Sequence, residues 1–168
     1  MKTNSKMIKQ KLILALFILL PFQSMANDVV ITVTGRVVPL PCTVDTTQLN
    51  MDLGKIYSSA LANPGSSSSW IHSRIRLSNC PTTTSGVTAS FSGQPGTRFY
   101  KNSGTAQNVE IQLTGSSGID FNNGTSERLS ITQQRTAEMP IMVRVFSPQG
   151  KATDGTIQVT INVTYTYQ

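Results

Sequence analysis

Apolar and polar residues alternate with a period of two in segment after segment beyond residue 26, and this alternation constrains the fold more than any other feature. Successive side chains of a β-strand point to opposite faces, so each such segment indicates a strand with one apolar face. The interior segments of this kind are residues 71–77, 87–91, 109–113 and 139–145. Clusters of glycine, proline, asparagine and serine separate these segments. No segment beyond residue 26 shows convincing helical periodicity. The pattern predicts an all-β chain folded as a sandwich of immunoglobulin type.

The tail is the clearest alternating segment. From Gly155 onwards the chain reads GTIQVTINVTYTYQ, in which apolar and aromatic residues occupy every second position. One face of the predicted strand therefore carries Ile157, Val159, Ile161, Val163, Tyr165 and Tyr167.

A second long alternating segment spans residues 28–38. Its apolar face would carry Val29, Ile31, Val33 and Val37, with Gly35 in the same row. The two terminal strands either pair within one molecule, or one of them serves another molecule, and the residues alone leave both possibilities open. An exposed apolar strand is a template for pairing with another chain, and proteins usually block such edges with charges or proline. Residues 28–38 contain only two charged residues and no proline, which favours use between molecules.

The first 26 residues have the pattern of a secretory signal peptide. Four lysines precede the uninterrupted apolar run LILALFILLPF, and small residues stand at the third-last and last positions before Asn27. The run is too short to span a bilayer, which takes about 20 residues. Cleavage after Ala26 would leave 142 of the 168 residues.

The chain contains two cysteines, Cys42 and Cys80. An exported chain with an even number of cysteines usually pairs them, and with two only one pairing exists. Two free thiols are the alternative, which an oxidising compartment disfavours. A disulfide here would contribute about 2–4 kcal/mol, mainly by restricting the unfolded chain.

Composition argues against several classes of function. The formal charge of +6 falls to +2 without the signal peptide, because four of the 14 basic residues and none of the eight acidic ones lie in it. No basic cluster suggests nucleic-acid binding. A single histidine, His72, leaves no set of residues for catalysis or for a metal, and no phosphate loop or other cofactor motif is present, so we expect no enzyme, no cofactor and no small-molecule substrate. Trp70 could stack on a sugar, but packing at the sheet rim is the simpler interpretation.

The whole mature chain resembles pilin subunits assembled by the chaperone–usher pathway, and among them the minor adaptors of type 1 fimbriae. Three features carry the resemblance: the alternating start with Gly35, the cysteine pair, and the terminal alternation with Gly155 fourteenth and Tyr167 second from the end. The matching stretches are VITVTGRVV, PCTV, DLGKIYS, LSNCP, VTASFSG, YKNSGTAQN and GTIQVTINVTYTY.

The resemblance implies an incomplete immunoglobulin-like sandwich, a pilin fold that lacks its last strand and is completed by donor-strand exchange. It implies three parts: a signal peptide over residues 1–26, a donor-strand extension over 27–40 and a pilin domain over 41–168. In this arrangement the extension fills the groove of a neighbouring subunit with the side chains of Val29, Ile31, Val33 and Val37, and Gly35 lies where the groove is too shallow for a side chain. The tail strand 157–167 borders the groove of its own chain.

The resemblance also implies partners and a location. The partners are neighbouring fimbrial subunits on both sides, a periplasmic chaperone that pairs with the tail strand and holds the carboxylate of Gln168, and an outer-membrane usher. The chain would be exported through the periplasm to a fimbria on the cell surface. Within the class it could be a minor adaptor or a major shaft pilin. The alternative from a different class is a self-contained secreted sandwich that binds a glycan, with its first strand paired internally.

Overall fold

The computed structural model describes residues 31–38 and 40–168. The predicted signal peptide and Val29 lie outside the described residues. The chain divides into two units, residues 1–36 and 37–168. In the described part of the first unit, residues 31–36 form no helix or strand and their side chains are exposed. No helix in the described part of the chain is long and apolar enough to cross a membrane.

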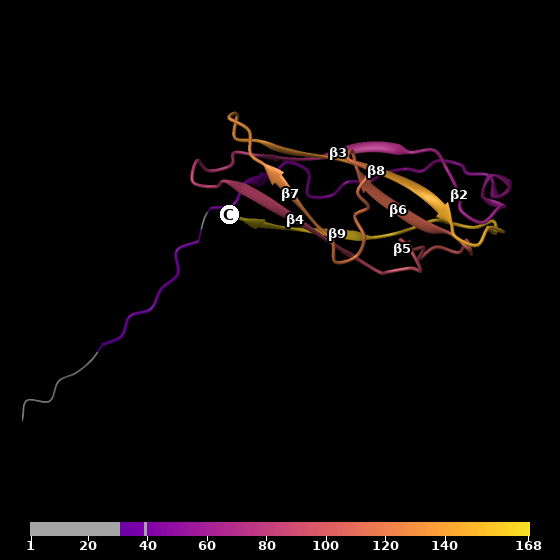
Figure 1. Cartoon of the computed structure of the whole chain (residues 1–168), viewed down its shortest axis with the longest axis horizontal. Coiled ribbons are helices and arrows are strands. Elements are labelled where there is room, and N and C mark those ends of the chain that lie inside the picture. The colour runs from indigo at the N-terminus through magenta and orange to yellow at the C-terminus, as the bar shows by residue number, and fades with distance from the viewer. Residues whose placement is uncertain (1–30, 39) are drawn as a thin grey trace, which may run out of the picture. The chain divides into compact units, whose positions relative to one another are not determined.

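The regular secondary structure of the second unit is almost entirely β-strand, so the predicted all-β fold is confirmed (Figure 1). A short 3-10 helix, η1 (Ser58–Leu61), is the single helical element among the described residues. The strands are β1 (Thr43–Val44), β2 (Ser66–Ser67), β3 (Ile71–Ser78), β4 (Gly86–Gly93), β5 (Tyr100–Lys101), β6 (Glu110–Gly115), β7 (Ser126–Ser130), β8 (Ala137–Ser147) and β9 (Ile161–Tyr167).

The strands form two antiparallel sheets that lie face to face (Figure 1). The larger sheet has the order β1-β3-β8-β6-β5, and β2 pairs with the end of β8. The smaller sheet has the order β7-β4-β9. β8 is the central strand of the larger sheet, because β3 pairs with it on one side and β6 on the other. β9 is an end strand of the smaller sheet, because within the described part of the chain it pairs only with β4.

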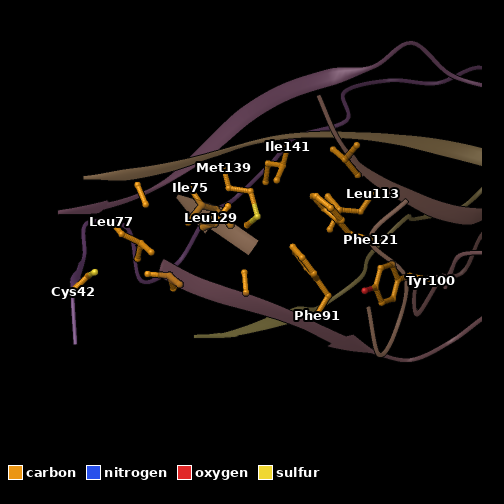
Figure 2. Packing of buried hydrophobic residues seen from close by; sticks show 14 of the residues in the cluster. Cys42, Ile75, Leu77, Phe91, Tyr100, Leu113, Phe121, Leu129, Met139 and Ile141 are labelled. Carbon is orange, nitrogen blue, oxygen red and sulfur yellow. The ribbon is translucent and has the colours of Figure 1, made fainter. Parts of the chain in front are cut away.

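The core lies between the two sheets, where their inward rows of apolar side chains meet (Figure 2). Leu77 of β3, Phe91 of β4 and Ile111 of β6 are each at most 1% exposed. Phe91 stacks on Phe121, with ring centroids 4.4 Å apart. Alternation therefore placed the apolar rows of these strands correctly, because each row faces the other sheet.

The predicted disulfide is confirmed: Cys42 and Cys80 are joined, and both are buried. The bridge fixes the start of the second unit beside the end of β3. The four interior strands predicted from alternation are also present, as β3, β4, β6 and β8. The sequence pattern did not indicate β7, in which Leu129 alone is an inward apolar residue.

The tail strand is shorter than predicted. Alternation continues from Ile157 to Tyr167, yet β9 begins at Ile161. Residues 156–158 instead bond with the loop between β5 and β6, for example through the amide of Ala106 and the carbonyl of Thr156 at 3.1 Å. Hydrogen bonds to this loop therefore replace strand pairing with β4 at residues 156–158.

Candidate functional site

The smaller sheet ends at β7 on one side and at β9 on the other, and the edge at β9 is the candidate site. β9 pairs antiparallel with β4 from Ile161 opposite Gly93 to Tyr167 opposite Val87. Among the described residues no strand pairs with the other side of β9. A strand with one free side presents backbone N–H and C=O groups that a further strand can use.

The apolar face of β9 is not fully covered. Its inward row and the two alternate residues before it pack on the core and remain half-buried: Ile157, Val159, Ile161, Val163, Tyr165 and Tyr167. By contrast, the inward side chains of β8 are at most 6% exposed: Ala137, Met139, Ile141, Val143 and Val145. We call the row of β9 and residues 157–160 the open edge.

The segment of residues 42–56, which we call the facing segment, meets the open edge at both of its ends. At one end the hydroxyl of Tyr167 donates a hydrogen bond to the carbonyl of Cys42 at 3.5 Å. At the other end Ile56 and Ile157 line one pocket. Between these ends no backbone hydrogen bond joins the facing segment to β9 among the described residues. The two stretches therefore run past each other without a ladder between them.

The facing segment itself has apolar side chains that are only partly covered. Val44, Met51 and Leu53 are half-buried and pack against the core. Apart from β1, the segment forms no strand. Half-buried apolar rows therefore lie on both sides of a strip that has no backbone ladder, and we call this strip the groove.

A pocket of about 220 Å³ closes one end of this groove. Its apolar lining comes from Ile56, Leu61, Ala106, Val109 and Ile157. Residues 152–155 form the remainder of the wall together with Ser58. An apolar side chain placed here would gain burial without displacing a charged partner, since the one ionisable lining residue, Asp154, is exposed.

Two tyrosines of the open edge have altered titration. Burial raises the pKa of Tyr165, and the neighbouring Tyr167 raises it further. Burial alone raises the pKa of Tyr167. Both phenols are therefore neutral at physiological pH, as suits side chains that contact an apolar core.

The structure places the predicted donor-strand residues in exposed positions. Ile31 and Val33 are 81% and 88% exposed, and Val37 is 99% exposed. Gly35 is exposed as well. Burial of these residues in a neighbouring subunit stays a prediction, as does the role of Gln168 towards a chaperone. A main-chain carboxylate oxygen of Gln168 accepts a hydrogen bond from the amide of Ser85 at 2.7 Å.

The minor candidates of the sequence lie on the outer surface. His72 is exposed on β3. Trp70 is half-buried, and the guanidinium of Arg144 lies 4.2 Å from the centroid of its ring. Such a cation–π contact is consistent with packing at the sheet rim. The described residues contain no group of three or more His, Cys, Asp or Glu that could hold a metal ion.

Sequence reasoning missed two parts of the site. One is the facing segment, in which Met51 and Leu53 alternate too briefly to stand out. The other is the loop of residues 102–106, which holds the start of the open edge. In this loop the side chains of Asn102, Ser103 and Thr105 form hydrogen bonds with backbone groups. Such polar residues have no periodic pattern by which the sequence could have indicated the contact.

Comparison with known families agrees with the fold. The family described as Fimbrial protein matches residues 31–168. Protein FimG of Escherichia coli strain K12 is 46% identical over 144 residues, which cover 84% of this chain and 86% of FimG. The fimbrial-like protein YdeR of the same strain is 42% identical over 85% of this chain and 87% of its own length. The S-fimbrial adhesin protein SfaS of Escherichia coli O6:K15:H31 is 34% identical over 87% of this chain and 89% of its own length.

Solved structures show the same fold at low identity. The P pilus rod subunit PapA covers 77% of this chain and is itself covered in full, with a TM-score of 0.63 and 18% identity. A subunit in the structure of a chaperone–usher pilus covers 84% of this chain, is itself covered over 96% and has a TM-score of 0.63 at 19% identity. The relatives and the fold are those of structural subunits, which confirms that the chain is not an enzyme. The chain belongs to the fimbrial protein family and is a subunit of the chaperone–usher type, built into a pilus on the cell surface with neighbouring subunits.

Proposed function

We propose that this subunit polymerises by donor-strand exchange, with its open edge as the acceptor. The observation that carries the proposal is the missing ladder between β9 and the facing segment, with half-buried apolar rows on both sides. A β-segment from a neighbouring subunit would pair with β9 and cover the open edge. The donor would supply one side chain to the pocket beside Ile157.

The donor that this subunit offers is its extension, residues 27–40. Ile31, Val33 and Val37 are exposed and apolar, and the alternation of the sequence would place them in one row with Val29 when the segment pairs as a strand. Burial of four such aliphatic side chains is worth on the order of 6–12 kcal/mol, as an upper bound. This is comparable with the whole stability of a small domain. The donated strand would therefore complete the fold of its acceptor.

A contact in which the donor end of one subunit enters the acceptor end of the next is head-to-tail and does not close. Such contacts generate fibres. The resemblance to FimG supports a minor adaptor position, with the major shaft pilin as the second possibility. A periplasmic chaperone would cover the open edge until assembly, and an outer-membrane usher would exchange it for the donor. The route of export runs through the periplasm, as the signal peptide predicts.

The test uses the mature chain, residues 27–168, and a variant that begins at residue 39. We expect the mature chain alone to unfold at low denaturant concentration, and a peptide of residues 27–40 to stabilise it by mass action. Removal of residues 27–38 should block growth of polymer and leave peptide binding intact. A mature chain that is a stable monomer, and that unfolds when residues 27–38 are removed, would overturn the proposal in favour of a self-contained sandwich.

The register of the donor strand has its own test. Gly35→Leu adds a side chain to the face that enters the groove, and Thr34→Leu adds a similar one to the opposite face. We expect Gly35→Leu to block assembly strongly and to leave the stability of the subunit unchanged. Thr34→Leu is the matched control and should assemble normally. Equal fibre yields from both variants would show that the assigned face is wrong.

A further inference from the structure

The start of the open edge is held by side-chain and backbone hydrogen bonds to a loop, in place of a β-ladder with β4. β9 bonds to β4 only from Ile161 onwards. Residues 156–158, which place Ile157 in the pocket wall, instead bond with the loop of residues 102–106. This loop connects β5 to β6 in the larger sheet, so the contact ties the two sheets together at the pocket end of the groove.

Asn102 is at the centre of this contact. Its side-chain nitrogen donates to the carbonyls of Ala106 at 2.9 Å and Thr156 at 3.2 Å. Its side-chain oxygen accepts from the amides of Gly104 at 3.0 Å and Gln158 at 2.8 Å. A carboxamide has two N–H donors and an oxygen with two lone pairs, so all of its hydrogen-bonding capacity is used. The residue is 8% exposed, which makes each of these bonds costly to lose.

The bonds of Asn102 lie on both sides of Ile157. Thr156 and Gln158 are held, and Ile157 between them is directed towards the pocket that Ile56 also lines. Thr105 adds a reciprocal pair, in which its amide donates to the hydroxyl of Thr156 at 3.0 Å and the amide of Thr156 donates to the hydroxyl of Thr105 at 2.9 Å.

Two glycines permit the close approach of loop and edge. A Cβ on Gly104 would overlap the carbonyl oxygen of Thr156. A Cβ on Gly155 would lie 2.5 Å from the amide nitrogen of Ala106, closer than real contacts allow. Both sides of the junction are therefore small at the positions where the backbones touch.

We infer that Asn102 is a positioning residue, which holds residues 156–158 so that Ile157 is in place when a donor strand enters the pocket end of the groove. The inference rests on the proposed strand-accepting function of the open edge. Without Asn102 the pocket wall would have to order as the donor arrives, and the loss of preorganisation would slow uptake.

The experiment compares Asn102→Ala with the control Gln107→Ala in the mature chain. Gln107 is exposed and directly follows this loop, and its side chain donates only to the carbonyl of Thr105 at 3.1 Å. Amide hydrogen exchange is measured residue by residue, and uptake of a fluorescent peptide of residues 27–40 is followed over time. We expect Asn102→Ala to raise exchange at Gln158 roughly tenfold and to slow uptake by a similar factor, while β9 keeps its protection and the control matches wild type.

A second variant covers the case in which Asn102→Ala does not fold. Asn102→Asp keeps the oxygen that accepts from Gln158 and loses the donor to Thr156, so exchange should rise by a smaller factor. Unchanged exchange at Gln158, or a uniform rise over β4 and β9, would overturn the positioning role. Failure of the wild-type chain to take up peptide would count against the proposed function instead, and the exchange data would still decide the role of Asn102.

Discussion

β8 and β9 have the same alternating pattern and differ in their surroundings. Both place an apolar residue at every second position towards the core. β8 has a strand on each side, and its inward side chains are at most 6% exposed. β9 has a strand on one side, and its inward side chains are all half-buried.

The difference shows that covering an apolar strand takes neighbours within its sheet as well as an opposite sheet. β9 packs on the same core as β8, yet its row stays partly exposed, since no strand among the described residues lies between it and the facing segment. Half-buried apolar side chains can contribute to binding when a partner covers them, since each further Å² of apolar surface that is buried contributes about 25 cal/mol. A neighbouring chain that covered the open edge would therefore gain apolar burial there.

The largest loss of stability should come from truncating a buried side chain of β8, the strand that has a partner on each side. Ile141 of β8 is 5% exposed and lies in the core cluster. We expect Ile141→Ala to lower the free energy of unfolding by about 2–5 kcal/mol, because it leaves a cavity. Denaturant unfolding with and without a peptide of residues 27–40 measures this. The loss should be the same in both conditions, and a loss that depends on the peptide would break the distinction between β8 and β9.

Alkaline pH should lower the stability of the fold through the ionisation of Tyr100, which is fully buried, unlike the tyrosines of the open edge. Burial raises the pKa of Tyr100 to about 12, and its exposed fraction is 0%. The unfolded chain ionises near pH 10, so the neutral phenol stabilises the fold below pH 10 and this contribution is lost as pH rises towards 12. The loss amounts to about 2–3 kcal/mol.

Unfolding curves between pH 9 and pH 12 measure that loss, with Tyr100→Phe as the control. The variant cannot ionise at this position and should lose correspondingly less stability over the same range. Bound peptide should leave the titration of Tyr100 unchanged and raise the pKa of Tyr165, because the donor removes water from the open edge. Equal alkaline losses in wild type and variant would show that Tyr100 does not titrate in this window.

Truncating an isoleucine of the open edge should cost less stability than Ile141→Ala, and the cost should depend on whether the peptide is bound. Ile161 of β9 is half-buried, so Ile161→Ala should cost about 1–2 kcal/mol in the chain alone, less than Ile141→Ala. With the peptide bound the cost should rise by about 1 kcal/mol, because the donor completes the burial. Denaturant unfolding measures both values. A cost independent of the peptide would place Ile161 outside the groove.

Alternation was sufficient to predict the strands of the closed part of the fold. It located β3, β4, β6 and β8 because each has an apolar row that its own chain buries. It also gave the face of β9, since Val163 and Tyr165 point to the core as expected. It failed for β7, where Leu129 is the one buried residue of the strand, so no period is visible.

The boundaries of the site were harder to predict than its apolar row. Alternation runs from Ile157, yet the ladder starts at Ile161, because hydrogen bonds from the side chain of Asn102 and from the backbone of its loop replace strand pairing. Such bonds depend on residues far apart in sequence and carry no periodic signal. The absence of a partner strand beside β9 could not be derived from alternation either, since the pattern gives a face and not its neighbour. It came from the resemblance to pilins.

The smallest loss of stability should come from removing a charge on the outward face of β8. This substitution tests whether the burial of inward side chains is what distinguishes β8 from β9. Glu138 lies 3.7 Å from Arg74 and 3.8 Å from Arg76, and these side chains are between 43% and 72% exposed. Exposed ion pairs are worth about 0.2–1 kcal/mol and weaken with salt. Glu138→Gln should therefore cost less than about 1 kcal/mol at low ionic strength and still less at high salt, as measured by denaturant unfolding. A cost as large as that of Ile141→Ala would mean that charges on β8, and not its closed apolar row, stabilise the strand against its neighbours.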